Sequence, residues 1–470
     1  MRAFFLFIAI GTIAVPSFAV EPKPTLRAGA FAMDVSPLHF PISVNGNFSD
    51  IKATAVHDPL HARCIVLDDG KIKLAIVIVD NCLMPRELID DAKTRAAAKT
   101  GIPVGHMLVS ATHTHTAPAV TACFGSNPDA KYVEFLTGKI AEGIEKANAN
   151  LTECELGWGV AQEPAQLFNR RWWIKPGMPN LDPFGNTTDL VRMNPGQLNP
   201  GLIAPAGPID PDVSVLSART ISGQPMALYT NYSLHYVGGY PAVSADYFGV
   251  VCEKLGPMIG GDAKFVGALS NGTSGDVNNI NFGQSPIKAG PGERIRVVGE
   301  VVATAAKKAY LSAKHTREVS FAVAERELEF AVRKPTVAEV TRAEAILKKI
   351  AGRNAAGADE VYAGETIAIH KYPNTVKLKL QVMRIGDLAI TAIPCEVFTE
   401  IGLEIKRRSP IQPTLNVSLA NGYNGYLPSP HQHHLGGYET WRARSSYLEV
   451  NASMGIVKTV LELLNEVAKK

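Results

Sequence analysis

The chain has 470 residues, of which 46% are hydrophobic and 19% are charged. This composition is typical of a globular protein and excludes a disordered chain, which would contain fewer apolar residues and carry a larger net charge. The formal net charge is only +3 and no long basic run accompanies it, so a dedicated nucleic-acid-binding protein is not expected.

The N-terminus has the features of an export signal. Arg2 is positively charged, residues 4–15 are apolar, and small residues precede a cleavage point after Ala19. The apolar segment is too short to span a bilayer comfortably, although an uncleaved anchor helix is the alternative interpretation. We therefore expect a signal peptide over residues 1–19 and a secreted or periplasmic mature chain over residues 20–470.

Apolar runs and turn residues predict strands and helices in the N-terminal half. An Asp-Gly turn between two apolar runs predicts a hairpin, and Pro before a periodic segment with Gly after it predicts a helix. The expected elements are a hairpin over 63–80, helices over 85–100 and 131–147, and a buried strand over 107–111. The segment 169–211 is rich in Pro, Gly and Asn and is expected to form a long ordered loop.

The C-terminal half continues the mixture of elements. We expect a helix over 336–351, a hairpin made of 376–385 and 388–393, and a C-terminal helix over 446–469. Strands and helices alternate irregularly, which predicts an α/β or α+β fold with a mixed β-sheet core and flanking helices. No internal repeat or linker is evident, so a single large domain is expected.

The six cysteines give no metal or redox motif. They are widely spread and form no C-x-x-C pair, which excludes a zinc ribbon and a thioredoxin-type motif. Export permits disulfides, but buried free thiols are an equally good interpretation.

Two histidines follow the expected strand over 107–111. His113 and His115 stand two residues apart, so on extended chain their side chains point to the same side. Neutral imidazole is the commonest metal ligand in proteins. The alternative is that backbone partners satisfy both rings.

Three other segments carry candidate site residues. His235 follows the apolar run 226–230, Glu396 follows the run 388–393, and a Gly-Tyr-Asn-Gly-Tyr segment ends at Tyr426. Taken singly, these residues have ordinary alternatives: a structural histidine, a carboxylate capping a helix N-terminus, and turn residues beside the core.

Together these segments resemble the N-terminal catalytic domain of the neutral/alkaline (non-lysosomal) ceramidases. The most specific part of the resemblance is Ser110-Ala-Thr-His113-Thr-His115. The other matching segments are Gly29-Ala-Phe-Ala-Met-Asp34, Asn169-Arg170, His235, Pro394-Cys-Glu396, Gly422-Tyr-Asn-Gly-Tyr426 and Tyr438-Glu439. The resemblance spans nearly the whole mature chain.

The resemblance implies one zinc ion per chain. In this family the zinc is held by the first His of H-T-H, a later His, a Glu and a Tyr, which here are His113, His235, Glu396 and Tyr426. The resemblance implies hydrolysis of a carbon–nitrogen (amide) bond. Catalytic zinc lowers the pKa of bound water to about 7, which would provide the nucleophile for this reaction. The implied partner is a small-molecule or lipid N-acyl substrate such as ceramide, with at most peripheral membrane contact and no protein partner.

The resemblance also implies catalytic residues. His115 is the acid–base candidate, Tyr438 a donor to the oxyanion or leaving group, and Arg170 a residue of the pocket. Where the family has a catalytic serine, this chain has Asn278, which can donate to an oxyanion but cannot act as a nucleophile. This departure leaves open an ester or N-acyl sugar hydrolase, or a non-catalytic ligand-binding protein.

A second departure concerns the C-terminus. Ceramidases carry an immunoglobulin-like C-terminal domain, whereas the last segment of this sequence is expected to be the helix over 446–469 and not a strand-rich domain. We therefore expect a single catalytic domain without that addition. Among the weaker candidates, His431, His433 and His434 suggest either a second metal site or a solvated loop, and the pair Trp172 and Trp173 suggests a substrate channel or an interface.

Overall fold

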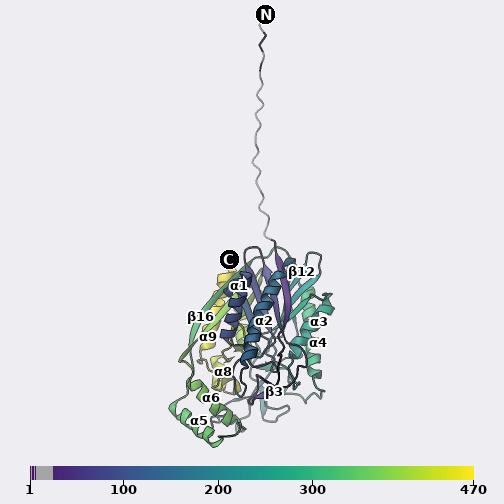
Figure 1. The fold of residues 1–470 in the computed structure, drawn as a ribbon. Coiled ribbons are helices and arrows are strands. Elements are labelled where there is room, and N and C mark those ends of the chain that lie inside the picture. Colours follow the sequence, from purple (N-terminus) through teal and green to yellow (C-terminus); the bar gives the residue numbers. More distant parts are fainter. Residues whose placement is uncertain (2, 5, 7–24) are drawn as a thin grey trace.

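The computed structural model describes residues 25–470 together with residues 1, 3, 4 and 6 (Figure 1). The signal peptide predicted over residues 1–19 lies outside the described residues apart from those four positions. Within the described part of the chain, no helix combines the length and the apolar character that crossing a membrane requires.

An eight-stranded mixed sheet occupies the N-terminal half. Its spatial order is β14-β13-β12-β7-β1-β4-β5-β6, and the pairs β5–β6 and β13–β14 are parallel. Its strands are β1 Arg27–Asp34, β4 His61–Asp68, β5 Lys73–Val79, β6 Met107–Ala111, β7 Thr152–Gln162, β12 Asp212–Thr220, β13 Pro225–Tyr232 and β14 Val266–Asn271. The hairpin predicted over 63–80 corresponds to β4 and β5.

A second sheet of four strands packs against the first. Its order is β16-β17-β18-β20, with bounds β16 Phe321–Ala331, β17 Thr375–Ile385, β18 Leu388–Ala392 and β20 Thr414–Val417. The continuous apolar run of β5 is explained by burial of both its faces. Leu74, Ile76 and Ile78 share a core with the second sheet, whereas the alternate residues Ala75 and Val77 face the opposite side.

Helices cover the outer faces of both sheets. Those longer than one or two turns are α1 Arg86–Thr100, α2 Ala130–Ala149, α3 Asp246–Ile259, α4 Glu293–Ser312, α5 Val337–Lys349, α6 Ala358–His370, α7 Thr399–Arg408 and α9 Ala452–Ala468. Figure 1 shows α1 and α2 side by side over one part of the large sheet and α3 with α4 over another. Because α7 and α9 cover the second sheet, the fold has four layers, helix–sheet–sheet–helix, and the predicted mixed α/β fold is confirmed.

Short strand pairs build the loops at one end of the sheets. The two-stranded pairs are β2 Ile42–Val44 with β3 Ile51–Ala53, β8 Phe168–Asn169 with β15 Val277–Asn278, and β19 Glu396–Val397 with β21 Tyr426–Leu427. A three-stranded sheet consists of β9 Arg171–Ile174, β10 Val191–Met193 and β11 Leu202–Pro205. In Figure 1 the label of β3 lies at the end of the molecule away from the C-terminus, near α5, α6 and the short helix α8 Pro430–Leu435.

Two predicted elements are wrong in part. The expected loop over 169–211 contains β9, β10 and β11, which sequence periodicity missed because strands of three or four residues are too short to show a period among many turn residues. The expected C-terminal helix over 446–469 begins only at Ala452. Ser446 instead forms isolated β-bridges to Gly425 and Ala443, so the chain is extended at this residue.

All six cysteines, each of them within the described residues, are buried and free. Of the two interpretations left open by the sequence, the structure therefore favours buried thiols. Burial raises the pKa of each thiol, so these groups are packing residues and not reactive thiolates.

Candidate metal centre

His113 is fixed at the end of two parallel strands. The chain leaves β6 at Ala111, and the amide of His113 donates to the carbonyl oxygen of Asn81, just beyond β5, at 2.8 Å. The backbone of His113 is left-handed, with φ of +79°, which is uncommon outside glycine and is held here by these flanking bonds. Its ring Nδ1 lies 2.9 Å from the carbonyl oxygen of Cys82.

His235 is held in a similar way after β13. Its ring Nδ1 lies 3.1 Å from the carbonyl oxygen of Ser274. The loop that follows is held by Asp246, whose carboxylate accepts from the backbone amides of Val237 and Gly238 at 3.1 and 2.7 Å. Backbone groups thus orient both histidine rings through the nitrogen on the far side of the site.

Glu396 and Tyr426 are neighbours because β19 and β21 pair in parallel with these two residues in register. The hydroxyl of Tyr423 donates to Oε1 of Glu396 at 3.1 Å. Helix α7 begins at Thr399 with Phe398 as its N-cap, so Glu396 does not cap it. The carboxylate is directed instead toward the histidines.

Three buried ligand-type atoms converge on one point. Nε2 of His113 lies 3.1 Å from Nε2 of His235 and 3.2 Å from Oε2 of Glu396. The three residues are only 2%, 2% and 4% exposed. Their ligand atoms all lie within 4.8 Å of one another, a spacing that a single ion can bridge.

The electrostatics of this cluster fit a bound cation. A carbonyl oxygen can only accept, so the ring nitrogens facing Cys82 and Ser274 carry the protons, and in the neutral imidazoles both Nε2 atoms present lone pairs. Burial and the nearby Arg170 lower the pKa of His235 well below 6.5, which keeps that ring neutral. Oε2 of Glu396 is buried without a hydrogen-bond partner. Three acceptors facing one another repel unless a cation lies among them.

Arg170, between β8 and β9, links Tyr426 to this centre. Its Nη2 donates to the hydroxyl of Tyr426 at 3.1 Å, and its Nη1 lies 3.3 Å from Nε2 of His235. Glu439 fixes the guanidinium by accepting from its Nε at 2.9 Å, while its other oxygen accepts from Arg171 at 2.6 Å. Burial raises the pKa of Tyr426 well above 10, so the phenol is protonated without a metal.

His115 lies beside the three converging atoms. Its Nε2 is 3.2 Å from Nε2 of His113, and its ring stacks on Tyr236 with centroids 3.7 Å apart. Gly46 lies against the other side, where a Cβ would overlap the imidazole. Burial and the nearby His113 lower the pKa of His115 well below 6.5, so the ring is a neutral base next to the cluster.

Tyr438 belongs to a group of aromatic rings next to Tyr426. Its centroid lies 5.8 Å from that of Tyr426. We define the aromatic group as the rings of Phe48, Phe124, Tyr362, Tyr438 and Trp441. Contacting rings within this group have centroid distances between 4.9 and 6.5 Å. Burial raises the pKa of Tyr438 well above 10, so its hydroxyl is a proton donor at neutral pH.

Asn278 lies on β15, which pairs with β8 next to Arg170. Its amide Nδ2 donates to Asn194 at 2.9 Å, and its Oδ1 accepts from the backbone of Ile280 at 2.9 Å. Both ends of this amide are therefore used within the protein.

The weaker candidates lie apart from the cluster. His431, His433 and His434 are on α8. Among the described residues, two groups have metal-binding spacing, His113 with His235 and Glu396 and His113 with Cys82 and His115, and the α8 histidines belong to neither. Burial lowers the pKa of His433 to about 3. Trp172 is half-buried on β9, beside the loop at Gly283.

Sequence reasoning missed two supporting residues. Tyr423 donates to Glu396, and Glu439 bridges two buried arginines, yet neither was assigned a role. The repeated Gly-Tyr of residues 422–426 is a signal for the first. Nothing local marks the second, because its partners lie more than 260 positions away in the chain.

The fold and this centre define a four-layer α/β protein with a buried His/His/Glu cluster suited to a divalent ion. No family model matches the sequence, and no curated protein matches it significantly. Among solved structures, the chain is similar to the neutral ceramidase from Pseudomonas aeruginosa, with a TM-score of 0.72 and 16% identity over 95% of this chain and 75% of that one. A ceramidase complexed with C2 matches with the same values. The resemblance to neutral ceramidases is thus confirmed for the fold.

Proposed function

We propose that this chain is a zinc-dependent hydrolase that cleaves the amide bond of an N-acyl compound. The observation that carries the proposal is the convergence of two imidazole lone pairs and a partnerless carboxylate oxygen, all buried, on one point. His113, His235 and Glu396 would hold one zinc ion, with Tyr426 as a fourth ligand. Two nitrogens and one carboxylate form a common ligand set of catalytic zinc in hydrolases.

A zinc ion held by these residues would supply a water molecule of pKa about 7 and would polarise the substrate carbonyl. His115, neutral and adjacent to His113, would accept a proton from the attacking water molecule as the oxygen of that water bonds to the carbonyl carbon. The same proton would pass to the nitrogen as the carbon–nitrogen bond breaks, which releases an amine and a carboxylic acid. This scheme has no step that needs a serine nucleophile.

The chain also offers donors for the charge that develops on the carbonyl oxygen. The guanidinium of Arg170 and the protonated phenol of Tyr438 lie on the Tyr426 side of the cluster. The amide of Asn278 is already bonded to Asn194, so the proposed scheme does not require it. The aromatic group, to which Tyr438 belongs, would offer an apolar surface for the acyl chain of the substrate.

Metal analysis and amide hydrolysis test the proposal together. We expect about one zinc per purified chain, and hydrolysis of N-octanoyl amides that is lost on chelation and regained with zinc. His113→Ala should lower both zinc content and kcat/KM by at least about 100-fold. His431→Ala, an exposed histidine on α8, is the matched control and should change neither.

Two results would contradict the proposal. The metal assignment fails if His113→Ala keeps its zinc and its activity. Tight zinc binding without turnover of any amide or ester would instead indicate the ligand-binding alternative. We further propose that the protein is exported, on the N-terminal sequence alone, which N-terminal sequencing of the mature chain would test.

A further inference from the structure

A second feature of the described chain, a cleft beside the metal centre, bears on the amine half of the substrate. The cleft has a volume of about 640 Å³, which is within the usual range for small-molecule sites. It lies between the loop over residues 279–292, the loop over 237–239 and the start of β8.

The cleft adjoins the metal centre through chain continuity. Val237 of its wall is two residues beyond His235, and Phe168 is two residues before Arg170. Two residues of chain span no more than about 7 Å, so the backbone of the wall at Val237 and Phe168 lies within about that distance of the backbone of His235 and Arg170. The cleft is lined by none of the described residues that make up the aromatic group, so the two surfaces are distinct.

The cleft is rich in uncharged hydrogen-bonding groups. Five side-chain amides line it, together with a single cation, and these residues are Gln166, Gln197, Asn279, Asn281, Gln284 and Arg294. Gln197 braces the loop by donating to the backbone oxygens of Asn281 and Gln284 at 3.1 Å each. Asn279 is half-buried and Gln284 is exposed in this lining, so their side-chain amides are accessible to a ligand.

We propose that this cleft binds a polar, hydroxyl-bearing amine half of the substrate, such as an amino sugar, while the acyl chain lies on the aromatic group. The inference rests on the proposed function, because an amide has two halves and the centre has two chemically different surfaces beside it. Side-chain amides both donate and accept, which matches hydroxyl groups, whereas a long alkyl amine offers them no hydrogen-bonding partner. Arg294 faces the amide of Gln166 at 2.8 Å and is the one cation of the lining.

The test compares three substrates that share an octanoyl group: N-octanoyl glucosamine, N-octanoyl octylamine and N-octanoyl alanine. With the zinc-loaded chain we expect kcat/KM to be at least about 10-fold higher for the glucosamine amide than for the octylamine amide. Asn279→Leu and Gln284→Leu should each lower it about 3- to 10-fold for the glucosamine amide alone. Gln224→Leu removes a half-buried amide that donates to Gly260 near the β12–β13 turn, outside the cleft, and is the control.

Three outcomes overturn the inference while leaving the hydrolase intact. They are a preference for the octylamine amide, leucine variants whose substrate preference is unchanged, and a preference for the alanine amide that Arg294→Gln abolishes. If no amide is hydrolysed, the proposed function has failed. Calorimetry of glucosamine binding to the metal-free chain then decides whether the cleft binds a hydroxyl-bearing amine. Binding of glucosamine that Gln284→Leu weakens supports the cleft assignment, and absence of glucosamine binding refutes it.

Discussion

Lys93 on α1 is a fully buried lysine whose charge should make the stability of the fold depend on pH. It is 0% exposed, and its Nζ donates to Oδ1 of Asn421 at 2.7 Å. Burial, with a further contribution from Lys379, lowers the pKa of Lys93 to about 7. The unfolded chain returns this amine to about 10.4, so the unfolded state binds more protons between these two values.

The sign of the effect follows from that difference. The contribution of Lys93 to the free energy of unfolding is lowest well below pH 7, rises between pH 7 and about 10.4, and is constant above that. A difference of about 3.4 pK units corresponds to about 5 kcal/mol over the whole range, of which about 2 kcal/mol falls between pH 7 and 9. Lys93→Met removes the titrating group, so its free energy of unfolding should lack this rise.

Urea denaturation at pH 7, 8 and 9 measures the effect. The difference in unfolding free energy between the wild type and Lys93→Met should change by about 2 kcal/mol in favour of the wild type from pH 7 to 9. Lys99→Met, an exposed lysine of the same helix, corrects for general effects of the replacement and should give a constant difference. Parallel pH profiles for the wild type and Lys93→Met would refute the reasoning, because they would show that the buried amine does not titrate in this range.

Three further predictions concern the metal centre. Glu439→Gln leaves the two buried guanidiniums that it bridges without a carboxylate and should lower the free energy of unfolding by about 3 kcal/mol, so an unchanged urea midpoint would contradict it. Gly46 has a φ of +101°, and Gly46→Ala places a Cβ against the ring of His115. We expect kcat to fall roughly 10- to 100-fold while zinc is retained, because the His115 ring is displaced. Loss of zinc from this variant would contradict the prediction. Tyr423→Phe removes a donor to Glu396 and should raise the Kd for zinc by about 10- to 100-fold in a chelator competition, and wild-type affinity would show that this bond is dispensable.

Elements with strong local signals were predictable from the sequence. The helix expected over 336–351 corresponds to α5, where Thr336 and Glu339 form a reciprocal capping box. The hairpin of β17 and β18 turns at Gly386, whose φ is +59°. These signals lie within a few residues of the element that they define, so they can be read without knowledge of the fold.

The supporting contacts of the metal centre were not predictable in the same way. The carbonyl oxygen of Ser274 orients His235, and Glu439 orients Arg170, but any residue has a carbonyl and Glu is common. Their roles arise only when strands distant in the chain come together. The candidate ligands themselves stood out because their residue types and order resemble a known family, not because of any local pattern.

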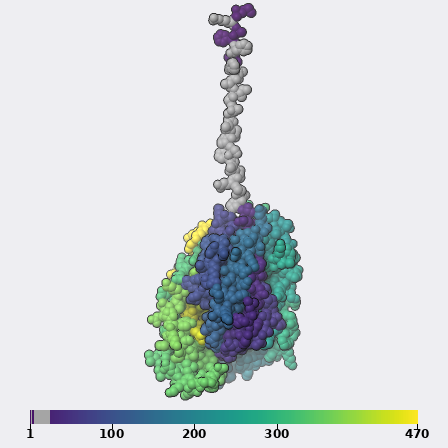
Figure 2. All heavy atoms as spheres, in the orientation of Figure 1, coloured from purple at the N-terminus to yellow at the C-terminus, as the bar shows by residue number. Residues whose placement is uncertain are grey.

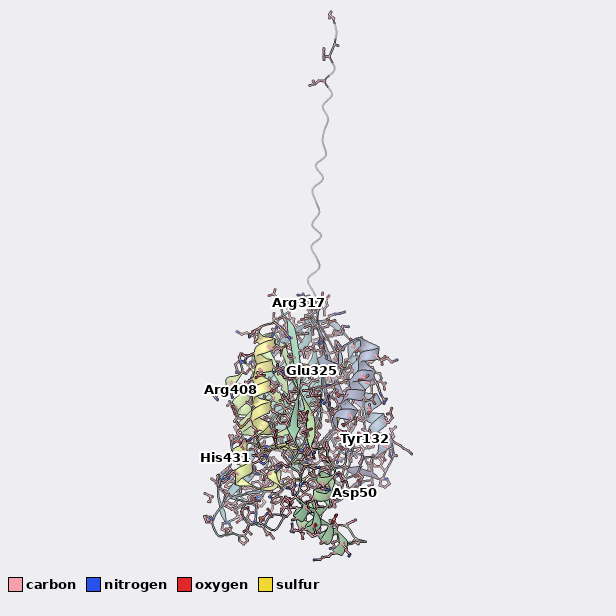
Figure 3. All side chains as sticks on the ribbon, turned by 90° about the vertical axis from the view of Figure 1, so that its left-hand side faces the viewer. Asp50, Tyr132, Arg317, Glu325, Arg408 and His431 are labelled. Carbon is pink, nitrogen blue, oxygen red and sulfur yellow. The ribbon has the colours of Figure 1, made fainter. Side chains whose placement is uncertain are left out.

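The position of α5 and α6 between β16 and β17 has a consequence for how the protein could diversify. The two strands pair in continuous register from Phe321 with Ile385 to Ala331 with Thr375, and the helices emerge beyond the last pair. Figure 2 shows the atoms of this segment in green at the end of the molecule opposite the C-terminus, and Figure 3 shows the same helices below Asp50. Because α6 brings Tyr362 to Phe48 and Phe124, substitutions within this helical segment would reshape the aromatic group, while the β16–β17 pairing that precedes the segment would keep its register.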